Sequence, residues 1–101
     1  MHLAVRLMQS LSLESRRKTI VYDLLDHPDM PDGFPHPADG RNLAGAYEDN
    51  RVIPCSGAQV TTFSDASKEI LLQLIKSFID FLPNGSLTAK MSDVKAHLDD
   101  T

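Results

Sequence analysis

A chain of 101 residues, of which 42% are hydrophobic and 24% charged, is long enough for one domain and has the composition of a globular rather than a disordered protein. Its formal net charge of −4 and its single short basic run, residues 16–18, argue against the basic surface that nucleic-acid binding requires. No apolar run reaches the roughly 18 residues of a membrane span, and a lone cysteine is typical of a reducing compartment, so we expect a cytoplasmic protein without nucleic-acid or membrane partners.

Two helices are predicted at the N-terminal end. The first ends near residues 10–12, because apolar residues recur at helical spacing at Leu3, Leu7, Met8 and Leu11. Ser12 is suited to cap the second helix, and Glu14 then lies in its first turn, where the helix dipole favours an anion. Apolar positions continue to Leu25, and we expect this helix to stop at His27, since a residue before proline is disfavoured in the α region.

The strongest helical pattern spans residues 64–82, with Ser64 as the cap and Pro83 after the end. At 100° per residue, nine apolar side chains fall in one arc of about 200°: Ile70, Leu71, Leu72, Leu74, Ile75, Phe78, Ile79, Phe81 and Leu82. A surface helix needs an apolar stripe of only about 100°. We therefore expect this helix to lie at the centre of the fold, with more apolar surface than so small a chain can cover without neighbouring polypeptide.

A fourth helix is predicted after an Asn84-Gly85 turn, with Ser86 as its cap. Its apolar face consists of Leu87, Met91, Val94 and Leu98. Its end places Asp99, Asp100 and the terminal carboxylate where the helix dipole is already negative. We therefore expect either that the natural chain continues beyond Thr101 or that a partner supplies positive charge there.

The predicted fold class is mainly α, with three or four helices around the central helix at about 64–82 and a long, ordered, Pro/Gly-rich loop at 27–60. Residues 50–53 and 58–63 favour extended chain and are candidates for a short two-stranded ribbon within that loop. We interpret residues 1–101 as a single helical domain or subdomain and as a fragment of a longer protein.

The loop from His27 to Val60 carries five of the six prolines and four of the five glycines. Compact domains rarely hold so long a structureless loop unless it has a function, and proline and aspartate turns would stiffen it against the rest of the protein. The candidate metal ligands in this loop and directly before it are Asp26, His27, Asp29, Asp32, His36 and Asp39. Their spacing matches neither a calcium loop nor a helical zinc motif, so we expect no metal site within this chain and assign no cofactor.

The segment HPADGRNLAGAYEDNRVIP, the long apolar helix after it and the final MSDVKAHLDDT together resemble the C-terminal part of the domain-of-unknown-function 3500 family of bacteria and fungi. By this resemblance, members are several times longer and carry a histidine-rich segment earlier and an aromatic stretch with Trp and Gly later. This chain has neither segment, and we carry over no functional residue.

Two functions are compatible with these patterns. In the first, the chain is a helical subdomain of a larger, enzyme-like protein, and loop 27–60 helps to line a small-molecule pocket with His36, Asp39, Arg41 and Asn42. No catalytic residue is assigned, because no Ser or Cys lies in a nucleophile elbow, and the sequence leaves open whether the protein is an enzyme. In the alternative, the apolar face of helix 64–82 or 86–98 docks onto the rest of the parent chain or onto a second copy in a homodimer. A third hypothesis is a metal site shared with a missing segment.

Overall fold

A computed structural model of the chain describes residues 2–24, 27–31, 52 and 54–101, and over these residues the protein is helical, without strands. The four α-helices are α1 (His2–Ser10), α2 (Leu13–Thr19), α3 (Asp65–Ile79) and α4 (Asn84–Ala96). Two single turns of 3-10 helix, η2 (Val60–Thr62) and η3 (Leu98–Asp100), complete the described secondary structure. The predicted mainly α fold class is confirmed.

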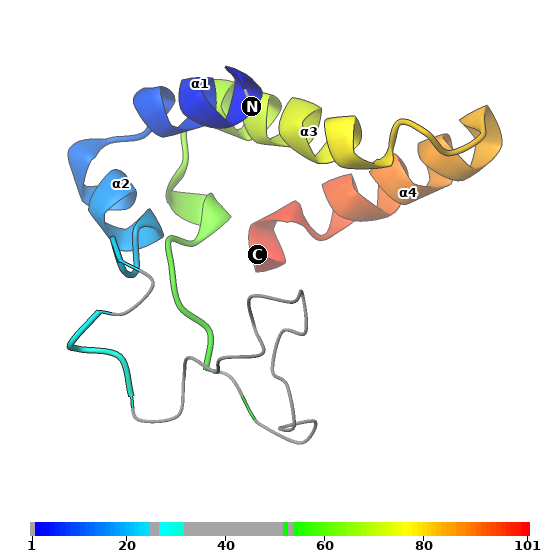
Figure 1. Ribbon diagram of the computed structural model, residues 1–101. Coiled ribbons are helices and arrows are strands. Elements are labelled where there is room, and N and C mark those ends of the chain that lie inside the picture. The colour runs from blue at the N-terminus through cyan, green and yellow to red at the C-terminus, as the bar shows by residue number, and fades with distance from the viewer. Residues whose placement is uncertain (1, 25–26, 32–51, 53) are drawn as a thin grey trace.

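Helix α3 is the centre of this arrangement, as the sequence predicts. It contacts both α1 and α4, and Figure 1 shows α1 alongside the first part of α3 and α4 returning beneath it as the second arm of a hairpin. The two 3-10 turns contact each other, and η3 also contacts α4. The C-terminal end of the chain therefore folds back toward the start of α3.

The corner between α1 and α2 is held by a serine cap and by one arginine. The Ser12 hydroxyl accepts a hydrogen bond from the Ser15 main-chain N–H at 3.1 Å, so the predicted cap is confirmed. From α2, Arg16 donates to two carbonyl oxygens at the end of α1, through Nε to Met8 at 3.0 Å and through Nη2 to Gln9 at 3.2 Å. A guanidinium at this position satisfies carbonyls that have no partner within α1 and complements its dipole.

The predicted end of the second helix, at His27, is wrong. Helix α2 ends at Thr19, and Ile20 has an extended backbone with φ −87° and ψ 93°. Two physical causes act together: Thr19, Ile20 and Val21 are β-branched and form helix less readily, and the described apolar residues of the stripe stay largely exposed. Ile20, Val21 and Leu24 are 50%, 47% and 60% exposed, so packing contributes little to any continuation of the helix.

Helix α3 begins at the predicted cap, since the Ser64 hydroxyl accepts a hydrogen bond from the Ser67 N–H at 3.2 Å. It ends at Ile79, three residues before the predicted end. The Leu82 N–H then donates to the Ile79 carbonyl at 3.1 Å, which closes a short turn ahead of Pro83. Local signals in the sequence therefore locate this helix closely.

We expect that replacing Ser64 with alanine lowers the free energy of unfolding by about 1 kcal/mol, because the N–H of Ser67 loses its capping partner. Ser86→Ala is the matched control: the sequence predicts Ser86 as a cap, but it lies inside α4 and is exposed. Urea denaturation followed by circular dichroism compares the two variants. Equal losses from both substitutions would contradict the assignment of the caps.

Helix α4 corrects the predicted Asn84-Gly85 turn and Ser86 cap, because it begins at Asn84 with Pro83 in the cap position. Proline is tolerated there since it needs no hydrogen-bond acceptor, and its carbonyl accepts from the Leu87 N–H at 2.8 Å. Asn84 and Gly85 form helix poorly in a helix interior, but here they lie in the first turn. Main-chain N–H groups of the first turn have no partner within the helix, so little helical hydrogen bonding depends on these two residues. The predicted apolar face is confirmed: from residue 84 to 101 the half-buried side chains are Leu87, Met91, Val94 and Leu98.

The predicted strand at residues 58–63 is also wrong, because Val60–Thr62 forms η2. Val60 is 3% exposed and is one of three buried apolar residues among those described, with Leu7 and Leu11. Its N–H donates to the main-chain oxygen of Thr101 at 2.9 Å. This hydrogen bond and the contact with η3 link η2 to the C-terminal end of the chain. The other candidate strand, residues 50–53, lies mostly outside the described residues.

Candidate functional site

The residues that the sequence predicts for a small-molecule pocket, His36, Asp39, Arg41 and Asn42, lie outside the described residues. The pocket in loop 27–60 therefore stays a prediction. Of the candidate metal ligands in that loop, His27 and Asp29 are described, and Asp26, Asp32, His36 and Asp39 are not.

His27 takes part in a local turn. Its Nδ1 accepts the main-chain N–H of Asp29 at 3.1 Å, and its carbonyl accepts the N–H of Met30 at 3.0 Å, with Pro28 at the second position of the turn. A neutral ring that accepts through Nδ1 carries its proton on Nε2, and this nitrogen lies 3.6 Å from Oδ1 of Asp23. The ring of Tyr22 lies 5.5 Å away between centroids. This is the turn chemistry that the sequence predicts for the loop, and in the described ranges no three His, Cys, Asp or Glu side chains gather as a metal site would require.

Positive charge at the acidic C-terminal end comes from this chain itself. Lys68, in the second turn of α3, places Nζ 2.7 Å from Oδ1 of Asp99 in η3. The lysine side chain is 24% exposed and the aspartate 68%. His97 and Asp100 form a second, more exposed pair at 3.3 Å. The sequence indicates an unfavourable interaction between Asp99 and the negative C-terminal end of the helix dipole. Lys68, 31 residues away along the chain, offsets it.

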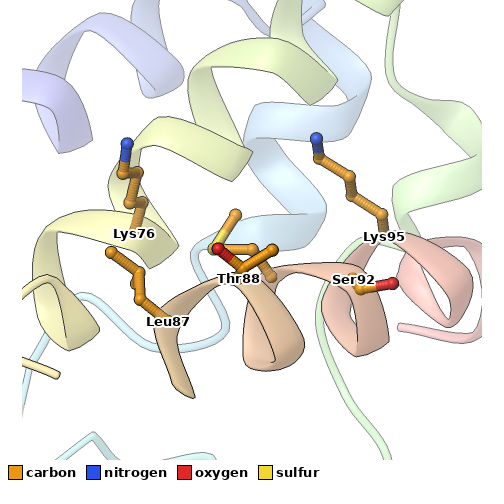
Figure 2. A pocket seen from close by; sticks show the side chains of 6 residues that line it. Lys76, Leu87, Thr88, Ser92 and Lys95 are labelled. Carbon is orange, nitrogen blue, oxygen red and sulfur yellow. The ribbon is translucent and has the colours of Figure 1, made fainter. Parts of the chain in front are cut away.

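A hollow of about 390 Å³ lies between α3 and α4. We call it the α3–α4 hollow, and its lining residues are Lys76, Leu87, Thr88, Met91, Ser92 and Lys95. Figure 2 shows Lys76 and Lys95 on either side of Thr88, with both ammonium groups pointing away from the α4 backbone. Neither ammonium has a carboxylate within ion-pair distance among the residues that the structure describes, whereas Lys18 and Lys68 both do.

The polar groups of the hollow differ in what they can donate. The Thr88 hydroxyl already donates to the Asn84 carbonyl at 2.9 Å, so toward a ligand it can only accept. The Ser92 hydroxyl makes no such bond to a described residue and can donate. Leu87 and Met91 are half-buried and form the apolar part of the lining. The hollow therefore combines two cations, one free hydroxyl and a small apolar surface.

A second candidate site is the exposed end of the apolar arc of α3. None of the nine apolar residues in the predicted arc is buried; seven are half-buried, and Phe78 and Phe81 are 73% and 80% exposed. We call these two residues the phenylalanine patch. Lys76 and Asp80 lie two residues before and after Phe78, so at 100° per residue they project to the opposite side of the helix. Phe78 therefore lies apart from the charged side of α3, and Phe81 follows two residues after the helix ends.

Sequence reasoning finds the phenylalanine patch through the width of the apolar arc, but it does not find the α3–α4 hollow. One signal was available: Thr88, Ser92 and Lys95 recur at spacings of four and three beside the apolar face of α4. Lys76 lines the hollow from α3, and its position there depends on how α3 packs against α4. The spacing of residues within α4 does not predict that packing. Cys55, for which the sequence suggests no role, is exposed.

None of the helices in the described part of the chain is long and apolar enough to cross a membrane. A family model described as protein of unknown function (DUF3500) matches residues 1–101, the whole chain. No curated protein and no solved structure is detectably similar to it.

Proposed function

We propose that this chain, which belongs to the DUF3500 family of proteins of unknown function, serves as a helical interaction module that docks through the phenylalanine patch onto a second copy of itself. The observation that carries the proposal is the exposure of Phe78 and Phe81, at 73% and 80%. Two largely exposed phenylalanines, one in the last turn of the central helix and one two residues beyond its end, are typical of a surface that a partner covers. The docking surface is the C-terminal end of the helix that the sequence predicts at 64–82.

Charge is compatible with a second copy as the partner. Each chain has a formal net charge of −4, so two copies repel each other wherever their acidic surfaces approach. At Phe78 this repulsion is small, because Lys76 and Asp80, two residues before and after it, project to the opposite side of the helix. In a two-fold dimer the same apolar patch faces itself, and the patch on each copy needs no complementary charge.

The size of the patch limits the expected affinity. A phenylalanine side chain buries about 150–250 Å² at most, so four partly exposed rings contribute on the order of 500–700 Å². A stable interface buries about 1,200 Å² or more, so half-buried neighbours such as Leu74 and Leu82 must contribute as well. We therefore expect a weak, reversible dimer with a dissociation constant of tens of micromolar or more.

Sedimentation equilibrium across about 10 μM to 1 mM tests this proposal. We expect the wild-type chain to shift from monomer to dimer and the Phe78→Ser/Phe81→Ser variant to weaken the dimer at least about tenfold, because two apolar anchors per copy are lost. The matched control is Ile20→Ser/Leu24→Ser, which removes apolar residues that are 50% and 60% exposed elsewhere on the surface. A wild-type chain that stays monomeric throughout, or equal weakening in both variants, would contradict the proposal.

Two finer expectations from the sequence also stand as proposals. One is that the chain corresponds to the C-terminal part of a longer bacterial or fungal protein, which the genomic sequence around its gene tests.

The other is the small-molecule pocket of loop 27–60, which His36→Ala and Asp39→Ala test in the full-length protein. Ligand binding should be lost, while the free energy of unfolding should change by less than about 1 kcal/mol.

A further inference from the structure

The α3–α4 hollow suggests a ligand through the charge and polarity of its lining. Lys76 approaches from α3 and Lys95 from α4, and both are cations without a described carboxylate partner in a chain that has 14 acidic and 10 basic residues. Asp80 lies one turn from Lys76, and Asp93 lies two residues from Lys95, yet neither aspartate forms an ion pair with them. The two ammonium groups are thus available to an anion from solution.

The other lining residues limit what that anion can be. Leu87 and Met91 present apolar surface, and the flexible methionine thioether adapts to irregular ligands. The Ser92 hydroxyl adds a free donor close to Lys95, whereas the hydroxyl hydrogen of Thr88 is engaged with Asn84. A volume of about 390 Å³ is at the lower end of the range of small-molecule sites, about 300–1,000 Å³. A bare inorganic anion would leave the apolar part of the lining unused.

We propose that the α3–α4 hollow binds a small amphiphilic anion, with a carboxylate or phosphate group held by Lys76, Lys95 and the Ser92 hydroxyl and an apolar portion against Leu87 and Met91. Charge-assisted hydrogen bonds from the two ammonium groups supply orientation and part of the affinity. The hollow is open and its lysines are exposed, so we expect weak binding that falls as salt is added. This site is independent of the proposed dimer, because Lys76 and Phe78 project to opposite sides of α3.

Nuclear magnetic resonance titration of the isotope-labelled full chain tests the site with four probes. Octanoate and hexyl phosphate carry both an anion and an apolar chain and so distinguish a carboxylate from a phosphate ligand. Octanol lacks the charge, and inorganic phosphate lacks the apolar chain. We expect octanoate or hexyl phosphate to shift the amide signals of Thr88, Met91 and Ser92, and octanol and inorganic phosphate to bind at least about fivefold more weakly.

Lysine variants supply the second measurement. Lys76→Gln and Lys95→Gln should each weaken binding of the better probe about three- to fivefold, and the double variant more than either. Lys90→Gln is the matched control, because Lys90 is an exposed lysine of the same α4 that does not line the hollow. Circular dichroism checks that each variant remains helical.

Three results would overturn the proposal. Octanol binding as tightly as octanoate and hexyl phosphate would show that the charge is not recognised. Equal weakening by Lys90→Gln would show that only the total charge matters. Signal shifts centred on Phe78 and Phe81 would show that the amphiphile covers the phenylalanine patch instead.

Discussion

Replacing Leu11 with alanine is expected to lower the free energy of unfolding by about 3 kcal/mol, because it removes a large part of a very small core. Leu11 is 6% exposed, and the described residues contain only two other buried apolar side chains, Leu7 and Val60. It lies in the corner between α1 and α2, directly before the Ser12 cap. A cavity there also weakens the contact through which α1 packs on α3.

Leu13→Ala is the matched control for this experiment. Leu13 is the same residue type two positions further along, but it is 63% exposed, so its truncation removes little buried surface. We expect a change below about 0.5 kcal/mol for this variant. Urea denaturation monitored by circular dichroism measures both, and a Leu11→Ala loss below about 1 kcal/mol would show that the corner is not part of the core.

The second large effect is expected at Ser67, where leucine should lower the free energy of unfolding by about 3 kcal/mol. Ser67 is 1% exposed at the crossing of α1 and α3. Its hydroxyl lies 2.9 Å from the Ser10 hydroxyl and 3.0 Å from the Ser64 hydroxyl. Leucine adds volume at a buried position beside Ser10, which costs about 1–3 kcal/mol. It also leaves the Ser10 and Ser64 hydroxyls with one partner fewer, which costs about 1 kcal/mol.

Two further variants separate these causes. Ser67→Ala keeps the volume small and removes the hydroxyl, so it should cost only about 1 kcal/mol. Ser77→Leu places the same leucine on an exposed position of α3, where we expect little or no loss. Hydrogen exchange then identifies the affected element: Ser67→Leu should expose the amides of α1 before those of α4. A Ser67→Leu variant as stable as Ser77→Leu would show that α1 does not pack closely on α3.

The two proposed surfaces share a physical origin in the shape of the hairpin. Helix α1 covers only the first part of α3, and α4 packs along another side of it (Figure 1). Phe78, in the last turn of α3, and Phe81, just after the helix, stay exposed. On the charged side of α3, the groove between the paired helices forms the α3–α4 hollow. Because the surfaces lie on opposite sides of one helix, ligand binding and dimerisation can be tested separately.

Local patterns in the sequence predict the start of α3, the Ser12 cap and the apolar face of α4. The caps depend on groups within one helical turn of each other, such as the Ser64 hydroxyl and the Ser67 N–H, and the apolar face depends on spacing along a single helix. Such interactions form in the same way whatever the rest of the fold does. The excess width of the apolar arc also follows from spacing alone, and it correctly indicates that α3 keeps uncovered apolar surface.

Only the tertiary structure decides where α2 ends, which group neutralises Asp99 and where the α3–α4 hollow lies. Helix α2 stops at Thr19, and Ile20 and Val21 beyond it are about half exposed; how far a side chain is covered cannot be read from its spacing. Lys68 reaches Asp99 across 31 residues, and Ser10 meets Ser67 across 57. Contacts at such separations depend on how whole helices pack, because no local preference of the intervening chain brings their side chains together.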